Sequence, residues 1–286
     1  MHKISKINLG RVLMLLLAFL ISINGALTKK LLTVFPQWEV IFYNALTCLI
    51  VSSIFIFIKG VKNFKVENIP KHFLRVFSMA FAFIIYVFSI QKIFIIEVMA
   101  IYNFAPVLST ILAIIFLKEK FNILRFIAVL LGFIGVLIVI KPEENMFTLI
   151  SLVPVLGAFF VAIAYVTTRS IMKYDNVYAT VFYYSLGLLV LSLFFFPKNF
   201  VLPSLGFLVL LFLAGFLSVV SHYLFALSVK FGEVSSVAPL EYTAFIWTGL
   251  FGYFLFYQIP SLTTILGGVI IIISGICLIR VEKYLI

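Results

Sequence analysis

Glu241 is the residue with the most distinctive chemistry here, because its carboxyl group stands at the edge of the longest uncharged stretch of the chain. No charged residue occurs from Tyr242 to Ile279. A carboxylate several residues inside a membrane-spanning helix costs at least about 2.5 kcal/mol, so we expect this side chain to face the protein interior. There it can pair with a cationic substrate, bind a coupling proton or hydrogen-bond to a structural partner.

Other polar side chains also lie inside apolar stretches. Buried amide, phenol and imidazole groups need hydrogen-bond partners, which neighbouring helices or a ligand can supply, and both alternatives stay open. The candidates for substrate contact are Asn24, Tyr102, Asn103, Tyr165 and His222. His222, with Ser218 one turn earlier, is also a candidate proton relay. Tyr242 and Trp247 offer rings on which a planar substrate group could stack.

Two prolines interrupt apolar stretches that are otherwise suited to helices. Pro106 and Pro239 each remove one backbone hydrogen bond and clash with the carbonyl group four residues earlier. A carbonyl group freed in this way must face protein or water inside a bilayer. We therefore expect two helix kinks that point towards a central cavity, with a simple packing kink as the alternative.

Two glutamates, Glu97 and Glu233, each open an apolar stretch. A carboxylate at a helix N-terminus is favoured by the helix dipole, and a lysine lies close to each one in the sequence (Lys92 and Lys230). A structural or gating role is therefore expected for both, rather than direct substrate contact.

The overall composition places these residues in a membrane protein. The chain has 286 residues, of which 64% are hydrophobic and 11% are charged, whereas a soluble domain is about 45–50% apolar and about 25% charged. The continuously apolar stretches predict membrane-spanning helices and exclude a transmembrane β-barrel. Cys48 and Cys277 show no metal-ligand or disulfide spacing. No metal site and no cofactor are expected.

Charged and proline-containing breaks divide the chain into ten predicted spans, each near the roughly 20 residues that a helix needs to cross a bilayer. Their ranges are 9–28, 37–58, 72–91, 96–117, 122–140, 148–169, 177–196, 204–229, 234–257 and 261–280. The predicted fold is thus an all-α integral membrane protein with ten transmembrane helices.

The basic residues predict the orientation of these spans. With the N-terminus in the cytoplasm, sixteen of the 21 lysine and arginine residues fall in inner segments. The outer segments hold only Lys29, Lys30, Lys92, Lys141 and Lys198. By the positive-inside rule, both termini are cytoplasmic. The net charge of +11 is thus explained by the orientation of the spans in the membrane. A nucleic-acid partner is not expected.

Comparison of the chain with itself predicts an internal repeat at offsets of 136 to 140 residues. Phe42-Tyr43 aligns with Phe182-Tyr183, Thr28-Lys29 with Thr168-Arg169, and Glu97-Val98 with Glu233-Val234. Five spans in each half mean that the second half enters from the opposite face of the membrane. We therefore predict two inverted five-helix repeats, residues 1–142 and 143–286, as in many secondary transporters.

The residues from Glu97 to Pro142 resemble the EamA family of the drug/metabolite transporter superfamily. The resemblance lies in Pro106, in Leu117-Lys118-Glu119, in Gly132, Gly135 and Val136, and in Pro142. The second half repeats the pattern loosely with Pro239, Gly268 and Gly275, while Gln258 stands where the family often has Glu and Asn44 where it often has Arg. The stretch from His72 to Arg75 adds similarity to S-adenosylmethionine uptake carriers of intracellular bacteria.

This resemblance implies a secondary transporter in a bacterial inner membrane. It would move a small organic metabolite by alternating access, with S-adenosylmethionine uptake as the best substrate hypothesis and with import or export of amino acids, nucleosides or vitamins as alternatives. Its partners would be that substrate, the lipid bilayer and a candidate coupling proton, in a monomer or a homodimer. An integral membrane enzyme lacks a visible nucleophile–base pair, so we predict no enzyme activity. A structural membrane subunit is the other alternative.

Overall fold

The computed structural model describes residues 2–119, 123–140, 152–196 and 200–283. Within these ranges the chain is entirely helical, without a β-strand. The predicted boundary between the two halves at 142/143 lies outside the described residues, as do Lys120, Lys141, Pro142 and Lys198.

Most helix ends lie within three residues of the predicted spans, but α1 begins seven residues earlier and α7 five residues later than predicted. The predicted spans 96–117 and 234–257 are each interrupted. The first half contains α1 (His2–Leu31), α2 (Gln37–Lys59), η1 (Val61–Phe64), α3 (Ile69–Lys92), α4 (Ile95–Tyr102), α5 (Ala105–Leu117) and α6 (Ile123–Ile140). The second half contains α7 (Val153–Ile171), α8 (Val177–Phe194), α9 (Leu205–Phe231), α10 (Val234–Val237), η3 (Ala238–Thr243), α11 (Ala244–Phe256) and α12 (Leu262–Lys283).

Seven of the described helical stretches are long and apolar enough to cross a membrane, counting the run Ile95–Leu117 as one. Shorter apolar stretches lie within α6 (Phe126–Gly135) and within α12 (Leu262–Ser274). The chain is therefore an all-helical membrane protein, and the count of ten spans stays a prediction.

Local capping decides where α3 begins. The Asn68 side chain accepts a hydrogen bond from the backbone N–H of Lys71 at 3.1 Å, and Pro70 occupies the first turn, where its missing N–H costs nothing. The helix therefore starts at Ile69, three residues before the predicted span. Arg75, which the charge count assigned to an inner segment although it falls inside the predicted span 72–91, lies within α3 and is 1% exposed.

The two prolines lie where helices are interrupted. Between α4 and α5 a turn at Asn103 and Phe104 interrupts the α-helix, directly before Pro106 in the first turn of α5. In the second half, the stretch from α10 to α11 passes through the 3-10 segment η3, which contains Pro239 and Glu241. A tighter 3-10 turn or a short break is the usual response to a missing backbone donor.

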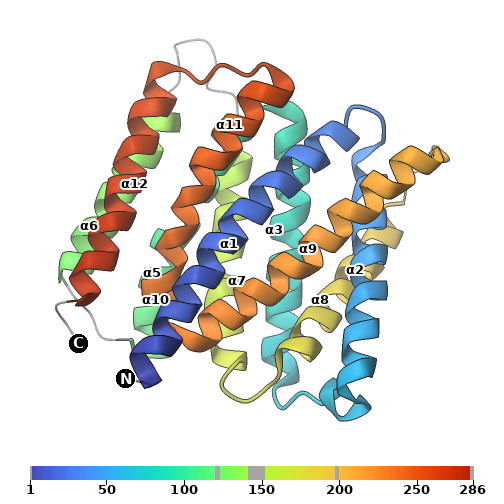
Figure 1. Ribbon diagram of the computed structural model, residues 1–286, viewed down its shortest axis with the longest axis horizontal. Helices are drawn as coiled ribbons and strands as arrows, with labels where there is room; N and C mark the ends of the chain where they lie inside the picture. Colours follow the sequence, from blue (N-terminus) through green and yellow to red (C-terminus); the bar gives the residue numbers. More distant parts are fainter. Residues whose placement is uncertain (1, 120–122, 141–151, 197–199, 284–286) are drawn as a thin grey trace.

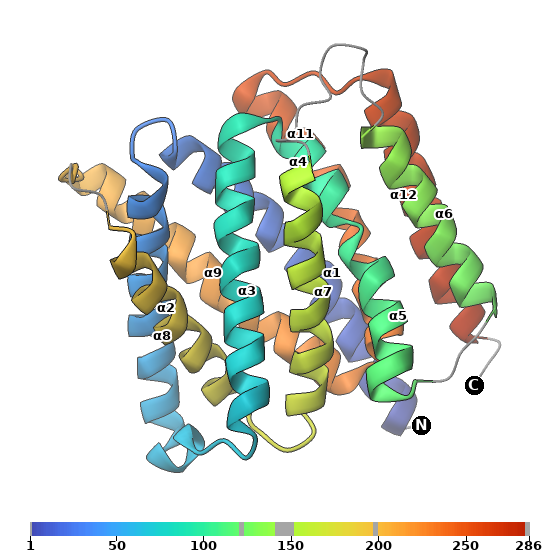
Figure 2. The same ribbon diagram turned by 180° about the vertical axis from the view of Figure 1, so that it is seen from behind.

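Figures 1 and 2 show how the helices are arranged. The α6 and α12 helices lie side by side at one edge of the bundle, α3 runs beside α7, and α1 crosses α9. The start of α1 and the end of α12 lie at the same end of the molecule, which we call the terminal end. The segment joining α2 to α3 and the loop joining α7 to α8 also lie at the terminal end.

Equivalent basic residues of the two halves make equivalent contacts. Lys29 at the end of α1 donates to the carbonyl oxygen of Ile90 near the end of α3, at 2.8 Å. Arg169 at the end of α7 donates to the carbonyl oxygen of Lys230 near the end of α9, at 2.9 Å. In each half, the first helix thus supplies a cation to the carbonyl-rich C-terminus of the third, where a positive charge is stabilising.

The two halves also cap each other's interrupted helices. Glu119, just after α5, accepts a hydrogen bond from the backbone N–H of Val234 at the start of α10, at 3.3 Å. Gln258, just after α11, accepts from the backbone N–H of Ile95 at the start of α4, also at 3.3 Å. Each cap satisfies a backbone donor that has no partner within its own helix.

Candidate functional site

A cavity of about 140 Å³ lies where the helices of both halves converge. Its walls come from α1, α3, α4, α7, α8, α9 and η3. The polar side chains that line it are Asn24, Tyr86, Tyr102, Asn103, Tyr184, Ser218, Ser221, His222 and Glu241. The apolar part of the wall includes Met79, Phe83, Met99 and Val161. The cavity therefore combines one carboxylate, several hydrogen-bonding groups and a mostly apolar surround, as small-molecule sites do.

Glu241 reaches the cavity from η3. Tyr165 on α7 donates its hydroxyl hydrogen to Glu241 Oε2, and the Tyr165 ring packs against Phe225 with 4.3 Å between centroids. Since Tyr165 is 2% exposed, it fixes the carboxyl group from the protein side. The carboxyl group can then present its remaining acceptor capacity to a cation or a proton in the cavity.

Ser218 on α9 joins three helices at the cavity wall. Its Oγ accepts a hydrogen bond from Asn24 Nδ2 on α1 and another from Asn44 Nδ2 on α2, both at 2.8 Å. The Asn44 amide is thus hydrogen-bonded within the bundle and links α2 to α9 at the cavity wall.

Four cavity-lining side chains keep a buried polar atom without a hydrogen-bond partner in the described part of the chain. These atoms are Asn24 Oδ1, Tyr86 OH, Asn103 Nδ2 and Ser221 Oγ. Buried polar groups are nearly always paired, so unsatisfied donors and acceptors that converge on one cavity indicate a place for a polar ligand or ordered water.

Aromatic side chains shape the remainder of the wall. The Tyr102 hydroxyl donates to the carbonyl oxygen of Ala82 at 2.7 Å, which ties the end of α4 to α3. The Tyr184 and His222 rings lie 4.0 Å apart between centroids. Tyr102 and His222 therefore have two roles: each contacts a neighbouring helix, and each presents a ring surface to the cavity.

Three of the predicted contact residues are not among those that line this cavity: Tyr165, Tyr242 and Trp247. Tyr165 lies behind Glu241, to which it is hydrogen-bonded. Tyr242 is 1% exposed and packs among Ile96, Ala100, Phe245 and Ile271. Trp247 is 38% exposed, and its ring meets Phe19 edge-on at 5.0 Å. The last two side chains point elsewhere because they follow Glu241 by one and six positions, which a helical path directs to other faces.

The two other acidic candidates mark helix starts. Glu97 lies in the first turn of α4, and Glu233 immediately precedes α10. Neither is among the cavity-lining residues. Among the described residues, no group of three or more His, Cys, Asp or Glu side chains is placed to hold a metal ion.

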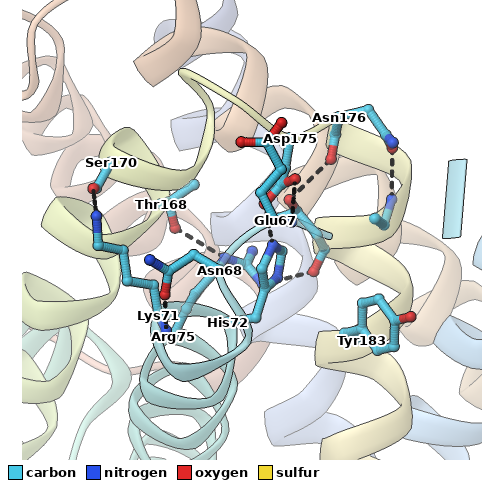
Figure 3. A network of polar contacts seen from close by, with 12 residues as sticks. Glu67, Asn68, Lys71, His72, Arg75, Thr168, Ser170, Asp175, Asn176 and Tyr183 are labelled. Carbon is cyan, nitrogen blue, oxygen red and sulfur yellow. Dashed lines mark hydrogen bonds and ion pairs between the residues drawn. The ribbon is translucent and has the colours of Figure 1, made fainter. Parts of the chain in front are cut away.

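A second polar cluster, which the sequence did not indicate as a site, lies at the terminal end (Figure 3). We call it the terminal network. His72 Nε2 lies 2.8 Å from Asp175 Oδ2, and Asp175 Oδ1 accepts from the backbone N–H of Glu67 at 2.9 Å. Lys71 donates to Ser170 Oγ at 3.0 Å.

Arg75 completes the terminal network on its inner side. Its Nε donates to Thr168 Oγ1 at 2.9 Å, and a terminal nitrogen donates to the carbonyl oxygen of Thr180 at 2.7 Å. Every contact joins residues 63–75 of the first half to residues 168–183 of the second. Arg75 already falls inside the predicted span 72–91, and a basic residue within a span was the sequence signal that could have marked it as an inward-facing cation.

Comparison with known proteins gives a consistent result. The family model described as "EamA-like transporter family" matches residues 8–141 and again residues 148–281. The S-adenosylmethionine uptake transporter of Rickettsia felis is 28% identical over 264 residues, covering 92% of this chain and 89% of that protein. The pseudopaline exporter CntI of Pseudomonas aeruginosa is 23% identical over 276 residues, covering 96% of this chain and 97% of that one.

A solved crystal structure of another protein shares the fold, with a TM-score of 0.77 at 14% identity over 98% of each chain. The named relatives are transporters, so the predictions of a membrane transporter and of no enzyme activity are confirmed. The two family-model matches, the apolar helices and the cavity between the halves lead to one conclusion: this chain belongs to the EamA-like transporter family.

Proposed function

We propose that this protein is a secondary transporter that moves a small organic metabolite across a bacterial inner membrane by alternating access. Ten helices form two inverted five-helix repeats with both termini in the cytoplasm. The observation that carries the proposal is the cavity between the halves, where Glu241 and four unpartnered polar atoms converge. The matched contacts of Lys29 and Arg169, and the reciprocal caps, support the repeat.

The terminal network is the natural closure of the cytoplasmic end. It holds the start of α3 in the first repeat against the end of α7 and the start of α8 in the second (Figure 3). Opening the site to the cytoplasm would separate these contacts. Rocking of one repeat against the other would then expose the same site on alternate sides of the membrane.

S-adenosylmethionine is the first substrate to test, because relatives in Rickettsia carry that name. The name of the Pseudomonas relative describes an exporter, so both directions of transport belong in the experiment. Amino acids, nucleosides and vitamins form the second group of candidates. Glu241 would contact the cationic group of the substrate or carry a coupling proton.

Purified protein in proteoliposomes tests this function. We expect substrate-dependent uptake by the wild type and a loss of at least about tenfold in Glu241→Gln, which removes the charge at the same volume. Glu39→Gln is the matched control, because Glu39 is also buried but lies at the start of α2, outside the cavity. Equal uptake by wild type and Glu241→Gln, with the same pH profile, would remove Glu241 from the mechanism.

A further inference from the structure

The terminal network contains a cation that the described protein does not neutralise. Arg75 is 1% exposed, and it makes no ion pair with a carboxylate of the described residues. One of its terminal nitrogens, Nη2, has no hydrogen-bond partner there. A buried charge without a counter-ion is expensive, so such a group is retained in a protein interior for a reason beyond stability.

Asp175 is the acidic side chain of the terminal network, yet it forms no ion pair with Arg75. Its Oδ2 lies 2.8 Å from His72 Nε2, and its Oδ1 accepts from the backbone N–H of Glu67. Arg75 is instead held by a hydroxyl and by a carbonyl oxygen, both neutral. These two contacts fix the plane of the guanidinium and leave its charge available.

Arg75 lies on the face of α3 that lines the cavity. Met79, Ala82, Phe83 and Tyr86 line the wall from α3, and Arg75 precedes Met79 by four residues, or one helical turn. Arg75 therefore stands directly beyond the cavity wall on the side of the terminal end.

One aromatic ring connects the guanidinium with the cavity. The central guanidinium carbon of Arg75 lies 5.8 Å from the centroid of the Tyr184 ring, and Tyr184 lines the cavity. The same ring meets His222, another lining residue. A change of the Tyr184 rotamer, or separation of α3 from α8, would open a path between Nη2 and a bound molecule.

We infer that Arg75 is the receptor for a carboxylate group of the transported substrate. Together with Glu241 it selects a zwitterionic metabolite that carries both a cationic group and a carboxylate. A guanidinium donates to both oxygens of a carboxylate in one plane, and such charge-assisted bonds are the strong ones in a protein interior. This inference rests on the proposed transport function and adds the substrate class.

Matched pairs of compounds test this assignment on the purified full-length protein. Each pair contains an acid and its decarboxylated analogue: S-adenosylmethionine with decarboxylated S-adenosylmethionine, methionine with 3-(methylthio)propylamine, and histidine with histamine. We expect the wild type to bind at least one acid roughly tenfold to a hundredfold more tightly than its partner. Arg75→Gln should reduce this ratio to near one while binding the decarboxylated partner as before.

Two further variants separate recognition from folding. Arg75→Lys keeps the charge without the planar fork, so it should retain only part of the preference. Arg169→Gln removes another arginine of the same end, one that serves the end of α9, and should keep the full preference. A structural role for Arg75 would weaken both members of each pair equally, and size-exclusion chromatography shows whether each variant is folded.

The outcomes distinguish this assignment from the proposed function. Uptake of the amines with no preference for the acids would overturn the carboxylate assignment and leave transport intact. An unchanged preference in folded Arg75→Gln or Arg75→Lys would overturn it too. Acid-selective binding that depends on Arg75 but occurs without uptake would support the assignment and contradict transport.

Discussion

At the scale of single residues, the cavity-lining side chains differ in whether their polar atoms are hydrogen-bonded to protein or left for a ligand. Ser218 and Ser221 lie on the same helix, line the same cavity and are both 5% exposed. Ser218 Oγ accepts two amide hydrogens, from Asn24 and Asn44, whereas Ser221 Oγ has no partner in the described residues. One serine therefore holds the bundle together, and the other is left for a ligand.

The pair makes a controlled prediction. Ser218→Ala should lower the free energy of unfolding by about 1–3 kcal/mol, because it leaves two buried amide groups without an acceptor. Ser221→Ala should leave stability nearly unchanged and weaken substrate binding. Thermal unfolding of both variants in detergent, with and without substrate, measures the difference. A larger loss of stability in Ser221→Ala would contradict this division of roles.

The sequence predicted the polar residues of the cavity better than its apolar and aromatic ones. Asn24, Asn103 and Glu241 stand out because a polar group in an apolar stretch has few other uses. Met79 and Tyr184 have no such signal, since the same residue types fill ordinary cores. Arg75 falls inside the predicted span 72–91 but was counted with the inner basic residues, because charge patterning cannot tell which basic residue near a helix start turns inward.

At the scale of helices, close approach at small residues holds α6 against α12. A Cβ atom at Gly135 would lie 2.7 Å from the carbonyl oxygen of Gly267 and 2.8 Å from Ile271 Cγ1. The spacing of Gly132 and Gly135 in the sequence is typical of a close contact between membrane helices. The helix that meets it could not be named from the sequence, because its partner lies more than 120 residues away.

Gly135→Ala should therefore destabilise the protein by about 1–3 kcal/mol, because the backbone of α12 has to move. Gly206→Ala is the matched control: its Cβ would meet nothing within 4 Å in the first turn of α9. That substitution should be neutral or stabilising by about 0.5–1 kcal/mol, from the lower helix propensity of glycine. Melting temperatures of the two variants check the prediction, and equal shifts would contradict it.

At the scale of the whole molecule, the positions of the helix ends bear on the orientation of the protein in the membrane. The beginning of α1 and the end of α12 lie at one end, together with the α2–α3 and α7–α8 connections beside the terminal network (Figures 1 and 2). Charge counting predicted that this end is cytoplasmic. The helix ranges and the common side of the termini could be predicted because hydropathy and charge act on whole segments. The packing of α3 on α7, and hence the terminal network, could not be predicted, because it depends on the fit of side chains between helices far apart in the sequence.

The proposed inverted repeat makes opposite predictions for the accessibility of two lysines, Lys92 and Lys230. Lys92 at the end of α3 and Lys230 near the end of α9 are both exposed. In a background without the two native cysteines, Lys92→Cys should react in spheroplasts with a membrane-impermeant maleimide. Lys230→Cys should react only after the membrane is disrupted. Reaction of both from the same side would rule out the inverted arrangement.

Because the chain is made from its N-terminus, the two reciprocal caps become possible at different times during synthesis. When Val234 leaves the ribosome, its acceptor Glu119 has already been made. Ile95 has to wait for Gln258, which follows it by 163 residues. At about 5–20 residues per second, this delay lasts on the order of ten to thirty seconds. The start of α4 therefore lacks this cap until Gln258 has been made, and a nascent chain halted before Gln258 would leave the Ile95 N–H without its acceptor.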